Sequence, residues 1–275
     1  MANLRSWMYV LLADENPMTV RQVFYQLEHR GLIANTEREY KGTVGRLLLD
    51  MRLKQEIPFG WISDGTRWMR KPRTYGGWQE ALRATAATYR RALWATQDAY
   101  VEVWLEKDAL AGVLFEETEQ WDVSLMVVKG FPSVTFLYEA AEAMKAQDKP
   151  TYRYYFGDHD PSGVAITRNV EKRLREFAPG VELHVERVAV TSAQIAAFQL
   201  PTRPTKQTDS RSRGFVGGSV EVDAIPSATL RELARRCITR HIDWAALDSL
   251  AVAERSERAY LTTLAQLPRE EGGRS

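Results

Sequence analysis

The sequence predicts an α/β protein in which a helical N-terminal part precedes a mainly parallel sheet flanked by helices. Two patterns carry this prediction. Apolar residues recur at helical spacing in short segments before residue 60, and β-rich runs alternate with helical segments after residue 100. Strands that alternate with helices of about 10 to 15 residues are typical of βαβ units, whose successive strands lie parallel.

Composition excludes several classes of protein. With 44% hydrophobic residues, 17 Gly and 11 Pro in 275 residues, the chain is neither disordered nor collagen-like. Its single cysteine, Cys237, permits no internal disulfide, and its four histidines lie at no zinc-binding spacing. No apolar run approaches the ~18 residues of a membrane span, and residues 1–10 lack a signal peptide. We therefore expect a reduced, cytoplasmic protein that does not contact a membrane.

Charge is distributed unevenly along the chain. Residues 1–94 contain 15 Lys and Arg against 9 Asp and Glu, whereas residues 95–275 contain 22 against 27, and the formal net charge is +1. A basic N-terminal part suggests contact with an anion such as nucleic acid. A chance fluctuation explains the asymmetry equally well.

Helix start and stop signals define the N-terminal part. After an apolar helical run at 7–12, Thr19 and Gln22 form a capping-box pattern, and Gly31 ends the helix that follows. Thr36 repeats the start signal with Glu39, ahead of apolar residues at helical spacing. Three short helices are therefore expected before residue 54.

A hairpin is expected after these helices. Residues 59–62 and 67–69 flank Asp64-Gly65, a strong signal for a tight turn between two strands. Three helices followed by a hairpin is the order of a winged helix-turn-helix. With a longer helix at 77–94, we assign residues 1–96 to a winged-helix DNA-binding domain.

The remainder alternates between strands and helices. Strands are predicted at 100–105, 124–128, 151–156, 182–190 and 219–224, and helices at 107–119, 133–147, 161–177, from 227 and from 244. Residues 201–218 are rich in Ser, Thr, Arg and Gly and are expected to form a loop. We assign residues 97–267 to the second domain and 268–275 to a frayed tail.

Carboxylates follow two of the predicted strands. Glu106 ends the first, and Asp158 and Asp160 follow the third. Ligands of open α/β sheets bind at the carboxyl ends of strands, and an oxygen-only cluster there suits Mg²⁺ (or Mn²⁺). Asp160 before Pro161 also fits a helix N-cap, and Glu106 taken alone fits a surface residue.

These acids also carry a family resemblance. Glu106-Lys107, Gly130 and Asp158-His159-Asp160, with Pro161 and Gly163 behind, resemble a Toprim domain. The Asp-Pro-x-Gly ending is most similar to the topoisomerase VI A subunit and its meiotic relative, the double-strand-break transesterase. Residues 220–225 resemble a Glu-Leu-Asp-Ala-Leu segment of that family, so that the matches span roughly residues 101–238.

The N-terminal part resembles the same family. Residues 20–27 are similar to its Arg-x-x-Tyr-Tyr run, whose second aromatic residue is the catalytic tyrosine. The resemblance implies that Tyr25 is this nucleophile, with Phe24 in place of the first tyrosine. A catalytic tyrosine on a winged-helix domain upstream of a Toprim pattern follows the family's domain order.

Helix geometry tests Tyr25 independently. Phe24 belongs to an apolar stripe at helical spacing, whereas Arg21 and Tyr25 lie one turn apart on another face. From there, Arg21 is expected to stabilise phosphate charge and to help ionise a phenol whose ordinary pKa is near 10. The alternative is a half-buried packing tyrosine.

Further basic residues are candidates for contact with DNA. Arg203, Lys206, Arg211 and Arg213 lie in the predicted loop, where they follow a DNA backbone or simply remain solvated. His159, between the two aspartates, is expected either to meet phosphate or to be exposed.

The resemblance implies a DNA-cleaving transesterase that acts on double-stranded DNA as a homodimer. The chain has no GxxxxGK[ST] loop, so strand passage would need a separate ATPase subunit. Two alternatives remain open. A Toprim nuclease would cleave DNA with a metal-activated water and leave Tyr25 a bystander, and a non-catalytic module would only bind DNA.

Overall fold

The computed structural model describes residues 2–63, 72–204, 215 and 217–267. The chain forms two compact units. The first comprises Met1–Arg67 and Asp98–His241, and the second comprises Trp68–Gln97 and Ile242–Ser275. The N-terminal helices therefore group with the sheet. The domain ranges 1–96 and 97–267 stay a prediction.

The first unit begins with the expected short helices. They are α1 (Ala2–Glu15), α2 (Val20–His29), the π-helical turn η1 (Arg38–Gly45) and α3 (Arg46–Leu53). The capping box is confirmed, because the Thr19 side chain accepts a hydrogen bond from Gln22 N and the Gln22 side chain accepts one from Thr19 N. Gly31 lies beyond the end of α2 with φ of +67°, a conformation that favours glycine.

The predicted hairpin is not confirmed. Phe59–Trp61 forms the 3₁₀ turn η2 instead of a strand, and Ile62 makes an isolated parallel bridge to Met18. Pro58 begins this turn, and its carbonyl accepts a hydrogen bond from Trp61 N at 3.2 Å. The predicted second strand, 67–69, lies outside the described residues. A winged helix is accordingly not established. The helices predicted before residue 54 are present.

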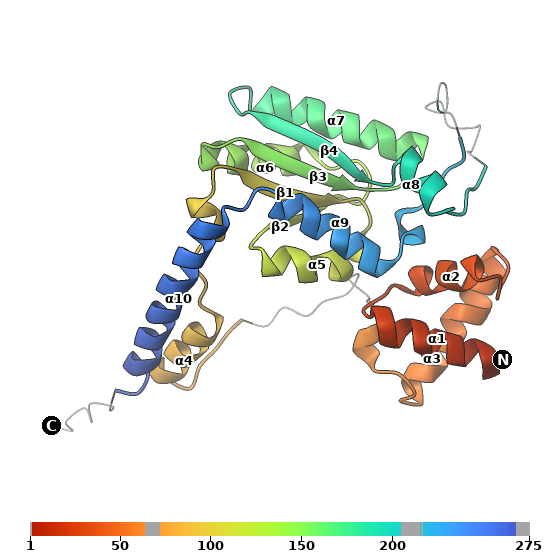
Figure 1. Ribbon diagram of the computed structural model, residues 1–275, viewed down its shortest axis with the longest axis horizontal. Helices are drawn as coiled ribbons and strands as arrows, with labels where there is room; N and C mark the ends of the chain where they lie inside the picture. Colours follow the sequence, from red (N-terminus) through yellow and green to blue (C-terminus); the bar gives the residue numbers. More distant parts are fainter. Residues whose placement is uncertain (1, 64–71, 205–214, 216, 268–275) are drawn as a thin grey trace. The chain divides into compact units, whose positions relative to one another are not determined.

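The sheet is confirmed as wholly parallel (Figure 1). Its spatial order is β2-β1-β3-β4. The strands are β1 (Tyr100–Leu105), β2 (Ser124–Val127), β3 (Thr151–Phe156) and β4 (Leu183–Ala189). The helical elements of this part are η4 (Asp108–Leu110), α5 (Ala111–Gln120), α6 (Val134–Gln147), α7 (Pro161–Phe177), α8 (Ser192–Ala197), η6 (Val222–Ala224) and α9 (Ser227–Thr239).

Helices cover both faces of the sheet. Trp104 of β1 and Tyr155 of β3 are buried in a core with Leu137 of α6 and Val170 of α7. On the opposite face, α5 and α9 contact each other (Figure 1). The chain leaves β1 for β2 on one side and later returns to β3 on the other. The carboxyl ends of β1 and β3 thus form the switch point at which such sheets bind ligands.

Two further predicted elements differ from the structure, and one element was missed. Residues 219–224 form no strand of the sheet: Ser219 and Val220 make isolated bridges to Arg203 and His159, and η6 follows. The short helix α8 was not predicted. The helix predicted at 77–94 ends early, because residues beyond Thr88 are held by side chains of α10, as described next.

The second unit is a helical pair. It contains α4 (Trp78–Thr88), the 3₁₀ turn η3 (Leu93–Thr96) and α10 (Trp244–Leu264). Tyr89 Oη donates to Glu257 at 2.7 Å, and Arg91 N donates to Glu254 at 2.8 Å, which holds the chain extended along α10. Of the helices in the described ranges, none combines the length and the apolar character needed to cross a bilayer.

Candidate functional site

The three predicted carboxylates lie at the switch point of the sheet. Glu106 directly follows β1, and its backbone N–H donates to the carbonyl of Phe156 at the end of β3 (2.9 Å). Asp158 lies two residues after β3, and Asp160 is the N-cap of α7, with Pro161 at the first helical position. The ends of two neighbouring strands and one helix thus bring these side chains to the same edge.

Glu106 is held by the residues around the end of β3. Its Oε2 accepts hydrogen bonds from Tyr155 Oη at 3.1 Å and from Asp158 N at 3.2 Å. Burial raises the pKa of the Glu106 carboxyl, and the charges of Asp158 and Asp160 raise it further. The loop closes tightly on this carboxylate, since a Cβ at Gly163 would lie 3.2 Å from the same oxygen.

Asp158 and Asp160 are each engaged by a backbone donor. Asp158 Oδ1 accepts from Val222 N at 2.8 Å and lies 3.8 Å from Lys107 Nζ. Burial raises the pKa of Asp158, although the charge of Lys107 opposes the rise. Asp160 Oδ1 accepts from Gly163 N at 2.6 Å, so one of its oxygens caps the helix.

The donor set suits a hard divalent cation only in part. Carboxylate oxygens are the ligands that Mg²⁺ and Mn²⁺ prefer, and the mutual repulsion at Glu106 is what such an ion would relieve. Within the described ranges, however, no three side chains are gathered around one point in a way that could hold a metal ion. The chemistry of the donors therefore fits the ion, whereas their present arrangement would have to change to bind it.

A charged network continues from this edge to the N-terminal helices. Lys107 Nζ lies 2.8 Å from Glu221 Oε2 and also contacts Asp223, which is 2% exposed. Asp223 Oδ1 in turn accepts from Thr19 Oγ1 at 3.1 Å, at the N-cap of α2. Burial opposes the charge of Lys107, but the surrounding carboxylates outweigh it and raise the pKa of this ammonium. The sequence pattern included Lys107 as the neighbour of Glu106 but gave no sign of its contacts with Glu221 and Asp223.

Tyr25 lies on α2 but is almost wholly buried. Its side chain is 3% exposed, because η6 packs against the face of α2 that was expected to be free. Burial, and then the charge of Glu221, raise the pKa of Tyr25 to about 12, despite the opposing charges of Arg203 and Arg21. Arg21 lowers the pKa of this phenol, as expected, but burial and the charge of Glu221 outweigh its effect.

Arg21 lies beside Tyr25 as predicted, but it contacts protein groups. Its Nη1 lies 3.3 Å from Glu221 Oε1, its Nη2 lies 3.7 Å from Glu37, and its guanidinium stacks over the ring of Tyr40 at 4.3 Å. A cavity of about 230 Å³ lies next to Tyr25, between α2 and the start of α9. Its lining includes His29, Phe198, Leu200, Pro201 and Pro226.

Of the predicted DNA-binding residues, the structure describes two. Arg203 is paired with Glu221 Oε1 at 3.1 Å, and so belongs to the charged network. His159 exchanges backbone hydrogen bonds with Val220, and burial lowers the pKa of its ring. Lys206, Arg211 and Arg213 lie outside the described residues.

Arg187 was not singled out by the sequence, but it shapes the site. From β4 it donates to the carbonyls of Gly157 at 3.0 Å and Gly163 at 3.3 Å, and also to that of Asp158. These bonds fix the loop that carries the aspartates. An arginine in a β-strand has no local signal for such a role, because its acceptors lie more than 20 residues away.

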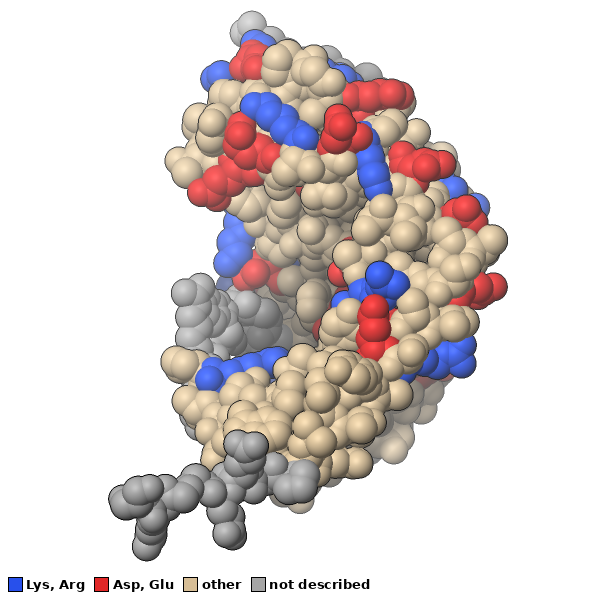
Figure 2. Space-filling model, turned by 90° about the vertical axis from the view of Figure 1, so that its left-hand side faces the viewer, with Lys and Arg blue, Asp and Glu red and all other residues tan. Residues whose placement is uncertain are grey.

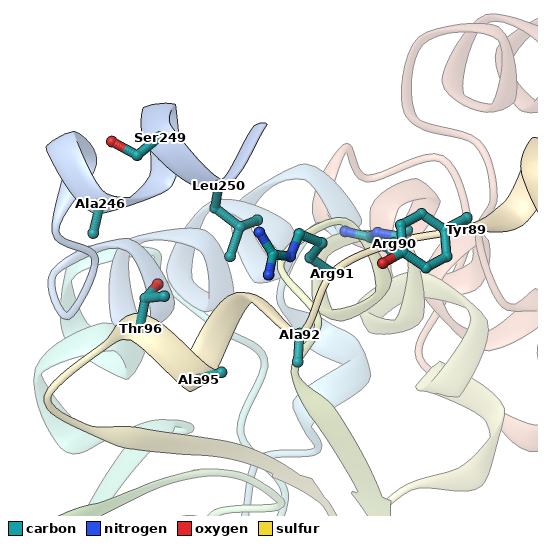
Figure 3. A pocket seen from close by; sticks show the side chains of 9 residues that line it. All are labelled: Tyr89, Arg90, Arg91, Ala92, Ala95, Thr96, Ala246, Ser249 and Leu250. Carbon is teal, nitrogen blue, oxygen red and sulfur yellow. The ribbon is translucent and has the colours of Figure 1, made fainter. Parts of the chain in front are cut away.

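The second unit contains a separate cavity of about 550 Å³ (Figure 3). It is lined by residues of the segment from Tyr89 to Thr96, which ends in η3, and by Ala246, Ser249 and Leu250 of α10. Arg91 Nε lies 3.6 Å from Glu257, so this cation is already paired. None of the predicted site residues contributes to this cavity.

Surface charge gives no clear basic stripe on the face that Figure 2 shows. Among the described residues in that view, Lys and Arg side chains are interspersed with Asp and Glu. The chain matches no protein-family model, and no curated protein matches it.

Proposed function

We propose that this chain cleaves double-stranded DNA by transesterification at the carboxyl edge of the sheet. Tyr25 is the nucleophile, and Glu106, Asp158 and Asp160 would hold Mg²⁺ (or Mn²⁺). One observation supports this most strongly: Glu106, Asp158 and Asp160 lie together where β1 and β3 end, and Glu106 Oε2 accepts from Asp158 N at 3.2 Å.

The chemistry follows from these groups. The Tyr25 Oη attacks a backbone phosphorus, and an O–P bond forms as the P–O3′ bond breaks. The phenol loses its proton to solvent, and the leaving 3′ oxygen gains one. The result is a phosphotyrosyl ester at the 5′ end, as in the family that the sequence resembles. Because one ester replaces another, the reverse reaction reseals the strand without ATP.

Each remaining side chain has a defined part. Arg21 offsets negative charge on the attacked phosphate, and Arg187 keeps the Asp158 loop in place. The bound metal ion would supply further charge neutralisation at the phosphate and at the leaving oxygen. The positive charge of Lys107 reduces the repulsion between the carboxylates at this edge and a nearby DNA phosphate.

The burial of Tyr25 sets a condition on this proposal. A side chain that is 3% exposed does not meet DNA, so attack requires α2 to separate from residues 221–224. In the family that the sequence resembles, each tyrosine serves the acids of the other protomer. We extend the proposal to a homodimer of this kind, in which strand passage takes its energy from a separate ATPase subunit.

Burial also favours a second candidate function. A phenol whose pKa is raised to about 12 is a poor nucleophile at neutral pH. If Tyr25 stays buried, the same acids would support hydrolysis of DNA by a water molecule. The acids are common to both reactions, and only the attacking oxygen differs.

Tyr25→Phe separates the two reactions. End-labelled supercoiled and linear DNA is incubated with Mg²⁺ or Mn²⁺ and examined on denaturing gels. Transesterification predicts labelled DNA attached covalently to the wild-type chain and none attached to Tyr25→Phe. Tyr40→Phe is the matched control, because this tyrosine also lies against Arg21 and packs on Phe24 at 5.5 Å.

The other outcomes decide between the alternatives. Cleavage without attachment, equal in wild type and Tyr25→Phe, would establish hydrolysis and remove Tyr25 from the mechanism. Absence of cleavage with either metal, while DNA is still bound, would overturn both reactions for the isolated chain and leave a binding module.

A further inference from the structure

Three cations converge on the carboxylate of Glu221. Arg21 Nη1 and Arg203 Nη1 both meet its Oε1, at 3.3 and 3.1 Å, and Lys107 Nζ meets its Oε2 at 2.8 Å. The Glu221 side chain is 24% exposed. Burial opposes the three cations, but their charges prevail and hold the pKa of Glu221 below its ordinary value. Glu221 is therefore an anion held in a cationic site.

The two arginines are also held by groups other than Glu221. Arg21 stacks on the ring of Tyr40 with its guanidinium 4.3 Å from the ring centroid. Arg203 donates from Nη2 to Asn35 Oδ1 at 3.1 Å. These contacts keep both guanidinium groups in position when the carboxylate between them is neutral or absent. The Arg203 side chain is 40% exposed, so an anion in solvent can reach this pair.

Lys107 would keep its acidic partners if Glu221 lost its charge. Its ammonium also contacts Asp223 and lies 3.8 Å from Asp158. Loss of the Glu221 charge leaves Lys107 between these two aspartates. The arginine pair would then keep only the exposed Glu37, 3.7 Å from Arg21 Nη2, as a counter-charge. Two guanidinium groups that converge on one oxygen are suited to an oxyanion.

We propose that Arg21 and Arg203 form a binding site for a phosphate group, and that the Glu221 carboxylate occupies this site as an internal competitor. A phosphate oxygen takes the position of Glu221 Oε1 and accepts from the same two Nη1 atoms. The identity of the ligand as a DNA backbone phosphate rests on the proposed function. The anion site itself rests only on the contacts given above.

Occupation of the site by phosphate would bring the ligand next to the candidate nucleophile. The Arg203 guanidinium lies 5.8 Å from the centroid of the Tyr25 ring, and Arg21 lies one helical turn from Tyr25. Displacement of Glu221 from Arg21 also removes one of the links between α2 and residues 221–224. Binding of phosphate and release of Tyr25 are thereby coupled through one carboxylate.

Glu221→Gln tests the site without any cleavage. Affinity of the full chain for inorganic phosphate is measured by calorimetry in EDTA at low salt. The neutral amide removes the competing charge, and we expect affinity to rise about tenfold or more, the effect of ~1.4 kcal/mol from one close charge. Glu37→Gln is the matched control: Glu37 also faces Arg21, at 3.7 Å, but it is 59% exposed and contacts neither Arg203 nor Lys107.

A second variant identifies the binding residues. Adding Arg203→Gln to Glu221→Gln is expected to abolish the gain, which assigns the phosphate to the arginine pair. No gain for Glu221→Gln in a folded chain, or a gain that survives Arg203→Gln, overturns the inference. Should Glu221→Gln not fold, Glu221→Asp withdraws the carboxylate by one methylene and is expected to raise affinity as well, and an unchanged affinity then refutes the site.

Failure of this inference is distinguishable from failure of the proposed function. Phosphate binding in EDTA involves neither Tyr25 chemistry nor a metal ion. A gain in phosphate affinity together with no DNA cleavage would keep the anion site and reject the transesterase. Covalent attachment of DNA to Tyr25 without any gain would do the reverse.

Discussion

Thr19→Ala should destabilise the contact between α2 and residues 221–224 more than a lost helix cap would. Thr19 Oγ1 accepts from Gln22 N at 3.0 Å and also donates to Asp223 Oδ1 at 3.1 Å. Thr19 and Asp223 are 3% and 2% exposed. The substitution therefore removes an N-cap and, in addition, one donor to a buried carboxylate.

The magnitude is the sum of two effects. Loss of a Thr N-cap costs about 1 kcal/mol. Loss of a hydrogen bond to a buried charged group costs a further ~1–3 kcal/mol. Thr36→Ala is the matched control, since Thr36 Oγ1 accepts from Glu39 N at 3.2 Å in the same local pattern but is exposed. We expect a total of about 2–4 kcal/mol for Thr19→Ala and about 1 kcal/mol for Thr36→Ala.

Amide hydrogen exchange of α2 is the appropriate assay. Two compact units need not unfold together, so a single global unfolding transition is not assumed. Exchange reports the free energy of local opening of each helix. Thr19→Ser, which keeps the hydroxyl, should recover most of the loss. Equal effects of Thr19→Ala and Thr36→Ala, within about 0.5 kcal/mol, would refute the argument that Asp223 depends on Thr19.

Two further substitutions test the acidic edge. Lys107→Met leaves buried carboxylates without their cation and should lower the free energy of local opening of β1, measured by amide hydrogen exchange, by about 3–5 kcal/mol. Lys129→Met breaks a partly exposed pair with Asp108 at 2.9 Å and should cost less than about 1 kcal/mol. Similar losses would contradict the central place of Lys107. Gly163→Ala puts a Cβ against the carbonyl of Asp158 and should cost about 1–3 kcal/mol in the same assay. Gly180→Ala meets nothing within 4 Å and should be tolerated. A harmless Gly163→Ala would show that the loop carrying Asp158 is free to adjust.

Local signals predicted the elements that depend on near neighbours in the chain. Thr19 and Asp160 cap helices as their sequence context indicates, and Ser133 caps α6. Each of these side chains accepts from a backbone N–H three residues on. Alternation of β-rich and helical segments likewise predicted the parallel sheet. That sheet in turn brings the ends of β1 and β3 together, so that the shared edge of Glu106 and Asp158 followed from the pattern alone.

Predictions failed where a distant segment sets the conformation. Residues 219–224 have a strand-like sequence, but Val220 pairs only with His159, and η6 follows directly. The helical wheel correctly placed Tyr25 off the apolar stripe of α2. It could not show that η6 packs on that other face, because the two segments are about 200 residues apart in the chain.

The sequence by itself determined most of the helices, the four strands of the sheet, their parallel direction and the acids at the carboxyl edge. These features depend on spacing and on short-range hydrogen bonds, which the order of residues specifies. Only the tertiary structure decided which charges face one another: Glu221 between Arg21 and Arg203, and Tyr25 buried beneath residues 221–224. Such pairings depend on long-range packing, and no periodicity in a single chain encodes them. They set the environment of Tyr25, and with it the chemistry that this residue can perform.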